Sequence, residues 1–214
     1  MKHKRPNPAS QSTTPARNPA VGDAEEATAR PRIIGGKFRH RRLIYAPNLH
    51  TRPMKDRVRE AVFNLIGPAV EGKHVIDLFA GTGALGFEGL SRGAAGATFV
   101  DRHFPTADLI RQNAAALEVA ERVTVYPANV LLWSRRLPPL PAAAAWLVFC
   151  SPPWDIYVEQ SEAVLGLLQT LLDHAPAASI FVVEADERFD LGLLPRPGEW
   201  MVREYPPAIV AILG

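Results

Sequence analysis

Cysteine is almost absent from the sequence: Cys150 is the only one in 214 residues. A single thiol excludes an internal disulfide framework and is typical of a reducing compartment. The chain has no apolar run near the ~20 residues that a membrane-spanning helix needs, and its polar, proline-rich start lacks the apolar stretch of a signal peptide. Its six histidines are scattered without metal-ligand spacing. We therefore expect a cytoplasmic protein that binds no metal and does not cross a membrane.

Charge is distributed unevenly along the chain, although the net charge is only +2. Residues 1–60 hold fourteen Lys and Arg against five Asp and Glu, whereas the remaining residues hold ten against seventeen. A basic front end on an acidic body predicts contact with a polyanion. A solvated charged arm would give the same pattern, so charge alone leaves both interpretations open.

Three regions follow one another in the sequence. Residues 1–30 are rich in Pro, Ala, Ser and Thr, cannot bury enough apolar surface to offset their ordering entropy, and are predicted to form a disordered basic tail. Residues 31–68 predict a small unit: two short strands around a Gly-Gly turn over Arg32–Ile44, then a helix over Lys55–Ile66. The basic residues of that helix are expected at its start or along its outer faces: Arg52, Lys55, Arg57 and Arg59. Residues 69–214 predict the main domain.

Strand-like and helix-like runs alternate through this main domain. The predicted strands are His74–Phe79, Ala97–Asp101, Arg122–Tyr126, Trp146–Cys150, Ser179–Glu184, Trp200–Tyr205 and Ala208–Leu213. The predicted helices are Ala84–Arg92, Phe104–Leu117, Val130–Arg135 and Val158–Leu172. This order predicts an α/β fold, a mostly parallel sheet covered on both faces, and its last two strands predict an antiparallel hairpin.

A glycine-rich turn lies between the first strand and the first helix of this domain. Gly81, Gly83 and Gly86 satisfy the G-x-G-x-x-G pattern, whose first interpretation is a dinucleotide-binding fold. Asp77 precedes these glycines, where a carboxylate would repel a pyrophosphate but could hold the ammonium group of an amino-acid-like cofactor. Asp101 ends the next strand, where an acid commonly accepts hydrogen bonds from ribose hydroxyls. Together these residues favour a nucleoside cofactor with an amino-acid end.

A second motif follows the strand Trp146–Cys150. It reads Ser151-Pro152-Pro153-Trp154, at the end of the sheet that faces the ligand crevice in such folds. Two prolines remove two N–H donors and leave carbonyls free to accept, and Trp154 offers a face on which a base can stack. The motif predicts a pocket for a stacked base with an exocyclic amine, although a proline-rich turn with a core tryptophan would look alike.

From Arg32 to about Leu213 the chain resembles the bacterial 16S rRNA (guanine-N2)-methyltransferase family of the RsmD type. The residues that carry the resemblance are Arg32-Ile33-Ile34-Gly35-Gly36, Arg52-Pro53, Asp56-Arg57-Val58-Arg59-Glu60, Phe63-Asn64, Asp77–Gly86 and Ser91-Arg92-Gly93-Ala94. The resemblance implies a Rossmann-like class I methyltransferase fold with a seven-stranded sheet. It also implies S-adenosylmethionine as the methyl donor and a guanine of small-subunit rRNA as the acceptor.

The resemblance also assigns site residues. Asp77 and the loop through Gly83 would hold the methionine end of the cofactor, Asp101 the ribose and Asn129 the adenine. The full predicted cofactor set is Asp77, Phe79, Ala80, Gly81, Thr82, Gly83, Asp101, Arg102 and Asn129. The predicted catalytic set is Ser151, Pro152, Pro153 and Trp154. The predicted RNA-binding set is Arg32, Lys37, Arg39, Arg41, Arg42, Arg52 and Arg57.

The sequence departs from the family at two positions. The catalytic loop begins with Ser151 where the family has Asp or Asn, which removes a carboxylate acceptor, and His103 stands where the family tends to have a second acid. No strong general base is visible in the sequence. Two alternatives stay open: a catalytically impaired RNA-binding protein of ribosome assembly that retains the cofactor pocket, and an NAD-dependent oxidoreductase. We expect a monomer that acts on the small ribosomal subunit or its assembly intermediate.

Overall fold

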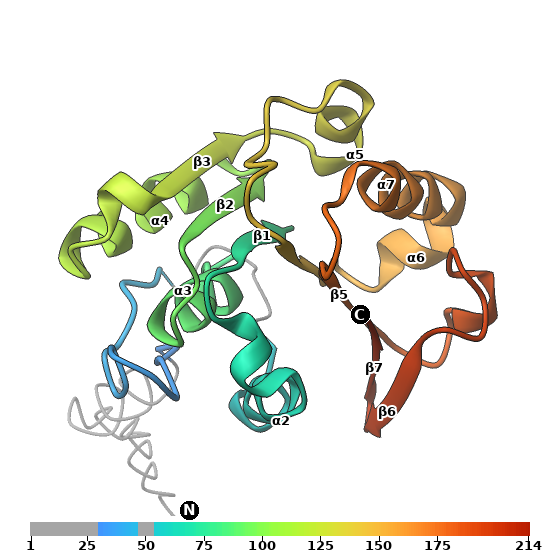
Figure 1. Cartoon of the computed structure of the whole chain (residues 1–214), viewed down its shortest axis with the longest axis horizontal. Coiled ribbons are helices and arrows are strands. Elements are labelled where there is room, and N and C mark those ends of the chain that lie inside the picture. Colours follow the sequence, from blue (N-terminus) through green and yellow to red (C-terminus); the bar gives the residue numbers. More distant parts are fainter. Residues whose placement is uncertain (1–29, 47–53) are drawn as a thin grey trace, which may run out of the picture. The chain divides into compact units, whose positions relative to one another are not determined.

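The computed structural model describes residues 30–46 and 54–214. Pro31–Gly214 form one compact unit, built on a seven-stranded sheet of order β3-β2-β1-β4-β5-β7-β6 (Figure 1). The strands are β1 (His74–Leu78), β2 (Gly96–Asp101), β3 (Val123–Pro127), β4 (Trp146–Cys150), β5 (Ile180–Ala185), β6 (Met201–Tyr205) and β7 (Ala208–Leu213). The pairs among β1 to β5 are all parallel, whereas β7 runs antiparallel to both β5 and β6. The predicted α/β class, strand number and reversed last strand are confirmed.

Helices cover both faces of the sheet because the buried strands are apolar on both sides. Every residue of β1 and β4 is buried. One core cluster packs residues of α2 (Asp56–Ile66), α3 (Ala84–Ser91) and α4 (Phe104–Ala116) against one face. The other cluster packs residues of α5 (Val130–Trp133), α6 (Asp155–Glu159) and α7 (Ser161–His174) against the opposite face. Short 3-10 turns are η2 (Gly67–Val70), η3 (Ala120–Arg122), η4 (Ser134–Arg136) and η5 (Leu191–Leu193).

The single helix predicted over Val158–Leu172 is wrong. The segment forms two helices, α6 and α7, which are separated at Gln160, where the backbone leaves the helical region with φ −138° and ψ 36°. The sequence pattern did not show this break because apolar side chains on both helices pack into the same core cluster. Because α6 starts immediately after the Ser-Pro-Pro-Trp motif, the break allows that motif to have a short helix of its own.

The N-terminal segment, residues 31–46, packs on the outside of α3 and α4. The two strands predicted over Arg32–Ile44 are reduced to one antiparallel bridge between Arg32 and Arg42. Other backbone groups of the segment form hydrogen bonds with the main domain. The N–H groups of Ile34 and Gly35 donate to the Glu88 carboxylate at 2.7 and 2.8 Å, and the Ile44 N–H donates to Asn113 Oδ1 at 2.7 Å. A ribbon of this length is marginal alone, and its contacts with α3 and α4 add to the hydrogen bonds within the segment.

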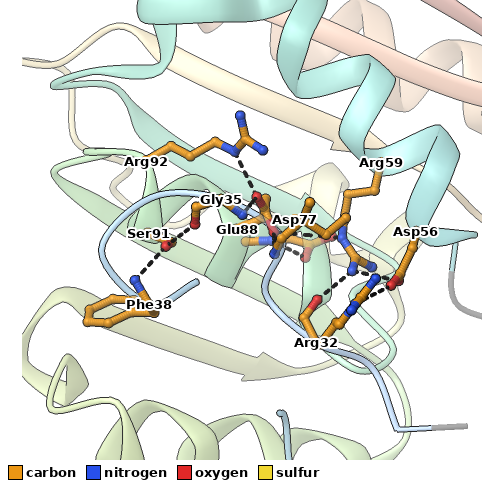
Figure 2. Close-up of polar contacts among 11 residues, drawn as sticks. Arg32, Gly35, Phe38, Asp56, Arg59, Asp77, Glu88, Ser91 and Arg92 are labelled. Atoms are coloured by element: carbon orange, nitrogen blue, oxygen red, sulfur yellow. Dashed lines mark hydrogen bonds and ion pairs between the residues drawn. The ribbon is translucent and has the colours of Figure 1, made fainter. Parts of the chain in front are cut away.

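Figure 2 shows the polar contacts that hold this segment, with the Glu88 carboxylate between the segment and Arg92. Ser91 adds two bonds, since its hydroxyl donates to the Gly35 carbonyl at 2.5 Å and accepts from the Phe38 N–H at 2.9 Å. The segment is therefore attached by buried polar groups as well as by the burial of Ile33 and Leu43.

Within the described ranges, no helix is long and apolar enough to cross a membrane. The same ranges contain no group of three or more His, Cys, Asp or Glu side chains arranged to hold a metal ion.

Candidate active site

A cavity of about 700 Å³ opens at the carboxyl ends of the parallel strands. Strands β1, β2 and β5, and the segments that follow β3 and β4, place residues there, as expected for the ligand crevice of an open α/β sheet. Twelve of the thirteen predicted catalytic and cofactor-binding residues line it: Asp77, Phe79, Ala80, Gly81, Thr82, Asp101, Arg102, Asn129, Ser151, Pro152, Pro153 and Trp154. Gly83 does not line the cavity; it turns the chain into α3, with φ 73°.

The glycine loop is a tight turn between β1 and α3. Gly81 has φ 52°, and the Gly83 N–H closes the turn on the Ala80 carbonyl at 2.7 Å. Gly86 has a different role, because a Cβ there would lie 2.2 Å from Cε1 of Phe99. The third glycine thus lets α3 pack directly against β2, while the first shapes the wall of the cavity.

Asp77 lies at the bottom of this wall and is buried. Its Oδ2 accepts a hydrogen bond from the Gly86 N–H at 2.9 Å. Burial raises the pKa of its carboxyl from 3.8 to about 8, and the nearby charge of Asp101 acts in the same direction. A cationic partner strongly stabilises the ionised form of a buried carboxyl whose pKa is raised, so Asp77 suits the ammonium end of an amino-acid-like ligand.

Asp101 is held in place at the end of β2 by two backbone donors. Its Oδ2 accepts from the Gly81 N–H and its Oδ1 from the His103 N–H, both at 2.8 Å. The carboxylate therefore links the glycine loop to the start of α4 with a fixed orientation. Carboxylate oxygens accept several bonds each, so Asp101 can still accept from the two hydroxyls of a ribose.

Asn129 follows β3 and caps α5. Its side-chain oxygen accepts from the backbone N–H groups of Leu131 and Leu132 at 3.0 and 3.3 Å, as an N-cap residue does. The predicted adenine contact would therefore use the amide nitrogen of Asn129. Capping also fixes the side chain at the rim of the cavity.

The Ser-Pro-Pro-Trp motif also lines the cavity, and it follows β4, the strand that pairs with β1. The Pro153 carbonyl accepts from the Ile156 N–H at 2.9 Å and the Trp154 carbonyl from the Tyr157 N–H at 3.1 Å, so both belong to the first turn of α6. The Trp154 ring is half-buried against the core cluster of that face. The Ser151 hydroxyl donates to a carboxylate oxygen of Glu184.

Glu184 and Arg59 are cavity-lining residues that sequence reasoning missed. Glu184 lies in β5 and is buried; it occurs in an apolar strand, and only the register between β4 and β5 brings it to the cavity. The placement of Arg59 on an outer face of its helix was wrong. It is 1% exposed, donates to Asp56 Oδ1 at 3.0 Å and to the Arg32 carbonyl at 2.6 Å, and desolvation lowers the pKa of its guanidinium.

Six of the seven basic residues predicted to bind RNA are described by the structure, and none of the six lines the cavity. Arg32, Lys37, Arg39, Arg41, Arg42 and Arg57 are all exposed, and Arg52 lies outside the described residues. Some already have protein partners: Arg32 pairs with Asp56 at 2.9 Å, and Arg41 donates to the Ala116 carbonyl at 2.8 Å. Exposed pairs of this kind contribute little stability, about 0–1 kcal/mol, so exchanging them for a phosphate costs little.

The sheet order and the cavity together define the class of this protein. In a dinucleotide-binding Rossmann fold the sixth strand extends a sheet of order 3-2-1-4-5-6. Here the reversed β7 is inserted between β5 and β6, and two acids, Asp77 and Asp101, line one cavity beside the glycine loop. This is the architecture of a class I S-adenosylmethionine-dependent methyltransferase, and the NAD-dependent alternative does not fit it.

Comparison with known proteins gives the family. The family model described as "Conserved hypothetical protein 95" matches residues 31–202. Ribosomal RNA small subunit methyltransferase D of Escherichia coli is 33% identical over 170 residues, which cover 79% of this chain and 80% of that protein. The chain belongs to this family, the RsmD type of methyltransferase, and the resemblance found in the sequence is confirmed.

One further curated relative and one solved structure also resemble this chain. The Bacillus subtilis protein YlbH is 42% identical over 95 residues, which cover 44% of this chain and about half, 52%, of that protein. The solved structure of the Escherichia coli protein yhhF matches with a TM-score of 0.68 and 28% identity, covering 86% of this chain and 97% of that one.

Proposed function

We propose that this protein transfers a methyl group from S-adenosylmethionine to the N2 amine of a guanine in 16S rRNA. The observation that carries the proposal is the meeting of the glycine loop, two acids and the Ser-Pro-Pro-Trp loop around one cavity of about 700 Å³. The volume suits a nucleoside-sized ligand with room for a base beside it. The named small-subunit rRNA methyltransferase among the relatives supports the choice of acceptor.

The donor side of the cavity fits S-adenosylmethionine. Asp77 would bind the ammonium group, Asp101 the ribose hydroxyls and Asn129 the adenine, while the backbone from Phe79 to Thr82 and the side chain of Arg102 enclose the ligand. The bound cofactor supplies an electrophilic methyl group on a positively charged sulfur. The residues of the chain hold and orient this ligand, which accounts for much of the rate through proximity.

The acceptor side fits a flat base with an amine. Guanine N2 is a poor nucleophile because its lone pair is delocalised into the ring, and its edge is hidden in a helix, so the base enters the cavity unstacked. Trp154 stacks on the base. The Pro152 carbonyl and the Ser151 oxygen accept hydrogen bonds from the amine and direct its lone pair at the methyl group.

Residues 31–68 form the RNA-gripping part of the molecule in this proposal, and residues 69–214 the catalytic part. The exposed cations of the first part, together with Arg52, contact phosphates, which position the RNA without selecting its sequence. We further propose that the protein acts as a monomer in the cytoplasm, where its substrate is the small ribosomal subunit or an assembly intermediate.

The test is transfer of labelled methyl from S-adenosylmethionine to small ribosomal subunits that lack the modification, followed by mapping of the label. Label on one guanine N2 is expected. Cofactor binding without transfer to any small-subunit substrate would contradict the proposal and favour the impaired RNA-binding alternative, which the uncharged Ser151 motivates. Trp154→Ala, tested beside the wild type, is expected to lose activity, and full activity would exclude the stacking role.

A further inference from the structure

Glu184 is connected to the acceptor loop by a direct hydrogen bond. β4 and β5 pair in parallel with Cys150 opposite Val183. The residues that follow these two, Ser151 and Glu184, therefore lie side by side at the carboxyl ends of their strands. Both line the cavity, Glu184 is 6% exposed, and the Ser151 hydroxyl donates to its Oε2.

This bond fixes what Ser151 offers to a ligand. A serine hydroxyl has one hydrogen to donate and lone pairs with which to accept. Because the hydrogen is directed at Glu184, only lone pairs face the cavity. Pro152 and Pro153 have no N–H groups at all. This wall of the cavity therefore presents acceptors to the base, which favours an exocyclic amine over a carbonyl group at the same place.

We propose that Glu184 is a positioning residue that acts through Ser151. It keeps the serine oxygen an acceptor toward the base amine, and it receives the proton that the amine must lose. The proposal rests on the proposed function and deepens it, because it supplies the base that the loop itself lacks.

The proton transfer balances. As the amine nitrogen bonds to the methyl carbon, the methyl–sulfur bond breaks with its electron pair left on sulfur, and the nitrogen becomes positively charged. One N–H proton then passes to the Ser151 oxygen while the hydroxyl proton passes to the Glu184 carboxylate. The products are the neutral methylated amine, an intact serine and a protonated Glu184, which returns its proton to water.

The experiment compares Glu184→Gln with Glu187→Gln, an exposed glutamate near the end of the same strand. Glutamine keeps the size of the side chain but cannot take up a proton, and general acid–base groups typically contribute about 10²–10⁴-fold to a rate. We expect kcat for methyl transfer to fall roughly tenfold or more in Glu184→Gln. The KM for small subunits and the Kd for S-adenosylhomocysteine should stay within about twofold, and Glu187→Gln should match the wild type.

A second test moves the carboxylate from Glu184 in β5 to position 151, directly after β4. Ser151→Asp combined with Glu184→Gln places an acid directly at the loop, and it should recover much of the lost kcat. Ser151→Ala alone should lose as much as Glu184→Gln, and it covers the case in which the glutamine variant fails to fold. Wild-type kcat in Glu184→Gln, or a double variant no faster than that single one, would overturn the relay alone. Absence of transfer by the wild-type protein would overturn the proposed function and the relay with it.

Discussion

Replacing Glu88, in α3, with glutamine should weaken the attachment of the N-terminal segment, residues 31–46, more than any other single isosteric change. The Glu88 side chain is fully buried. It accepts hydrogen bonds from the N–H groups of Ile34 and Gly35 and from Arg92 Nε at 2.7–2.8 Å, and Arg59 Nε lies 3.9 Å from its Oε2. Figure 2 shows Gly35 and Arg92 directed at this carboxylate.

The size of the effect follows from what glutamine cannot do. Only one of its two terminal atoms accepts hydrogen bonds, so at least one donor would face an amide NH₂ group. The partly buried Arg92 guanidinium would lose its carboxylate partner, and Arg59 would keep only its pair with Asp56. Removing one partner of a buried ion pair costs about 3–5 kcal/mol. Since domains of this size are stable by about 5–15 kcal/mol, we expect the free energy of unfolding of Glu88→Gln to fall by about 3–5 kcal/mol.

Urea denaturation at pH 7 measures this directly, with Glu60→Gln as the matched control because Glu60 is exposed on α2. The control should stay within about 0.5 kcal/mol of the wild type. Hydrogen exchange locates the effect, since the amides of Ile34 and Gly35 should exchange faster in Glu88→Gln. A loss below about 1 kcal/mol with unchanged exchange would refute the claim that this carboxylate holds the segment.

Three further results are expected. Ionised Asp77 is the form that binds an ammonium group, and its pKa is raised to about 8. Calorimetry should therefore show that the affinity for S-adenosylhomocysteine rises as pH increases from 6.5 to 8, by up to about tenfold per pH unit. Asp77→Asn should bind weakly without this pH dependence, and a wild-type affinity that does not change with pH would exclude this role of Asp77. Binding to small-subunit RNA should weaken steeply as the salt concentration rises. Arg39→Gln should remove one phosphate contact and flatten the slope of log K against log salt by about 0.9. An unchanged slope would show that Arg39 contacts no phosphate. Gly86→Ala should destabilise the fold by about 1–3 kcal/mol in urea, because its Cβ would lie 2.2 Å from the Phe99 ring; a variant as stable as the wild type would show that the ring moves aside.

Local patterns were enough to predict most of the sheet and one side of the cavity. β4 and β7 have the predicted bounds; β1, β2 and β6 differ by one residue at one end, and β3 and β5 by one residue at each end. The agreement is this close because apolar runs and turn residues act over a few positions. The glycine loop and Asp101 were predicted for the same reason, since each follows directly from the end of a strand.

Contacts between distant segments could not be predicted in this way. Glu184 reaches Ser151 through the register of β4 and β5, and Arg59 is buried because Asp56 and the Arg32 carbonyl satisfy it. In the sequence both residues look like ordinary charges, one within a strand and one on a helix. Arg59 and Arg32 are 27 residues apart in the sequence, and Glu184 and Ser151 are 33 residues apart. The periodicity of a single helix or strand does not predict contacts over such separations.

Asp77 and Glu88 show why burial of an acid does not by itself reveal its role. Both lie at the β1–α3 unit, and both are buried. Glu88 accepts two backbone N–H bonds and one from Arg92, so its charge is balanced within the protein and it holds two segments together. Asp77 accepts one bond from Gly86 among the described residues, and its pKa is raised. An acid whose charge is not fully balanced within the free protein is stabilised by a cationic ligand. Of these two acids, Asp77 lines the cavity.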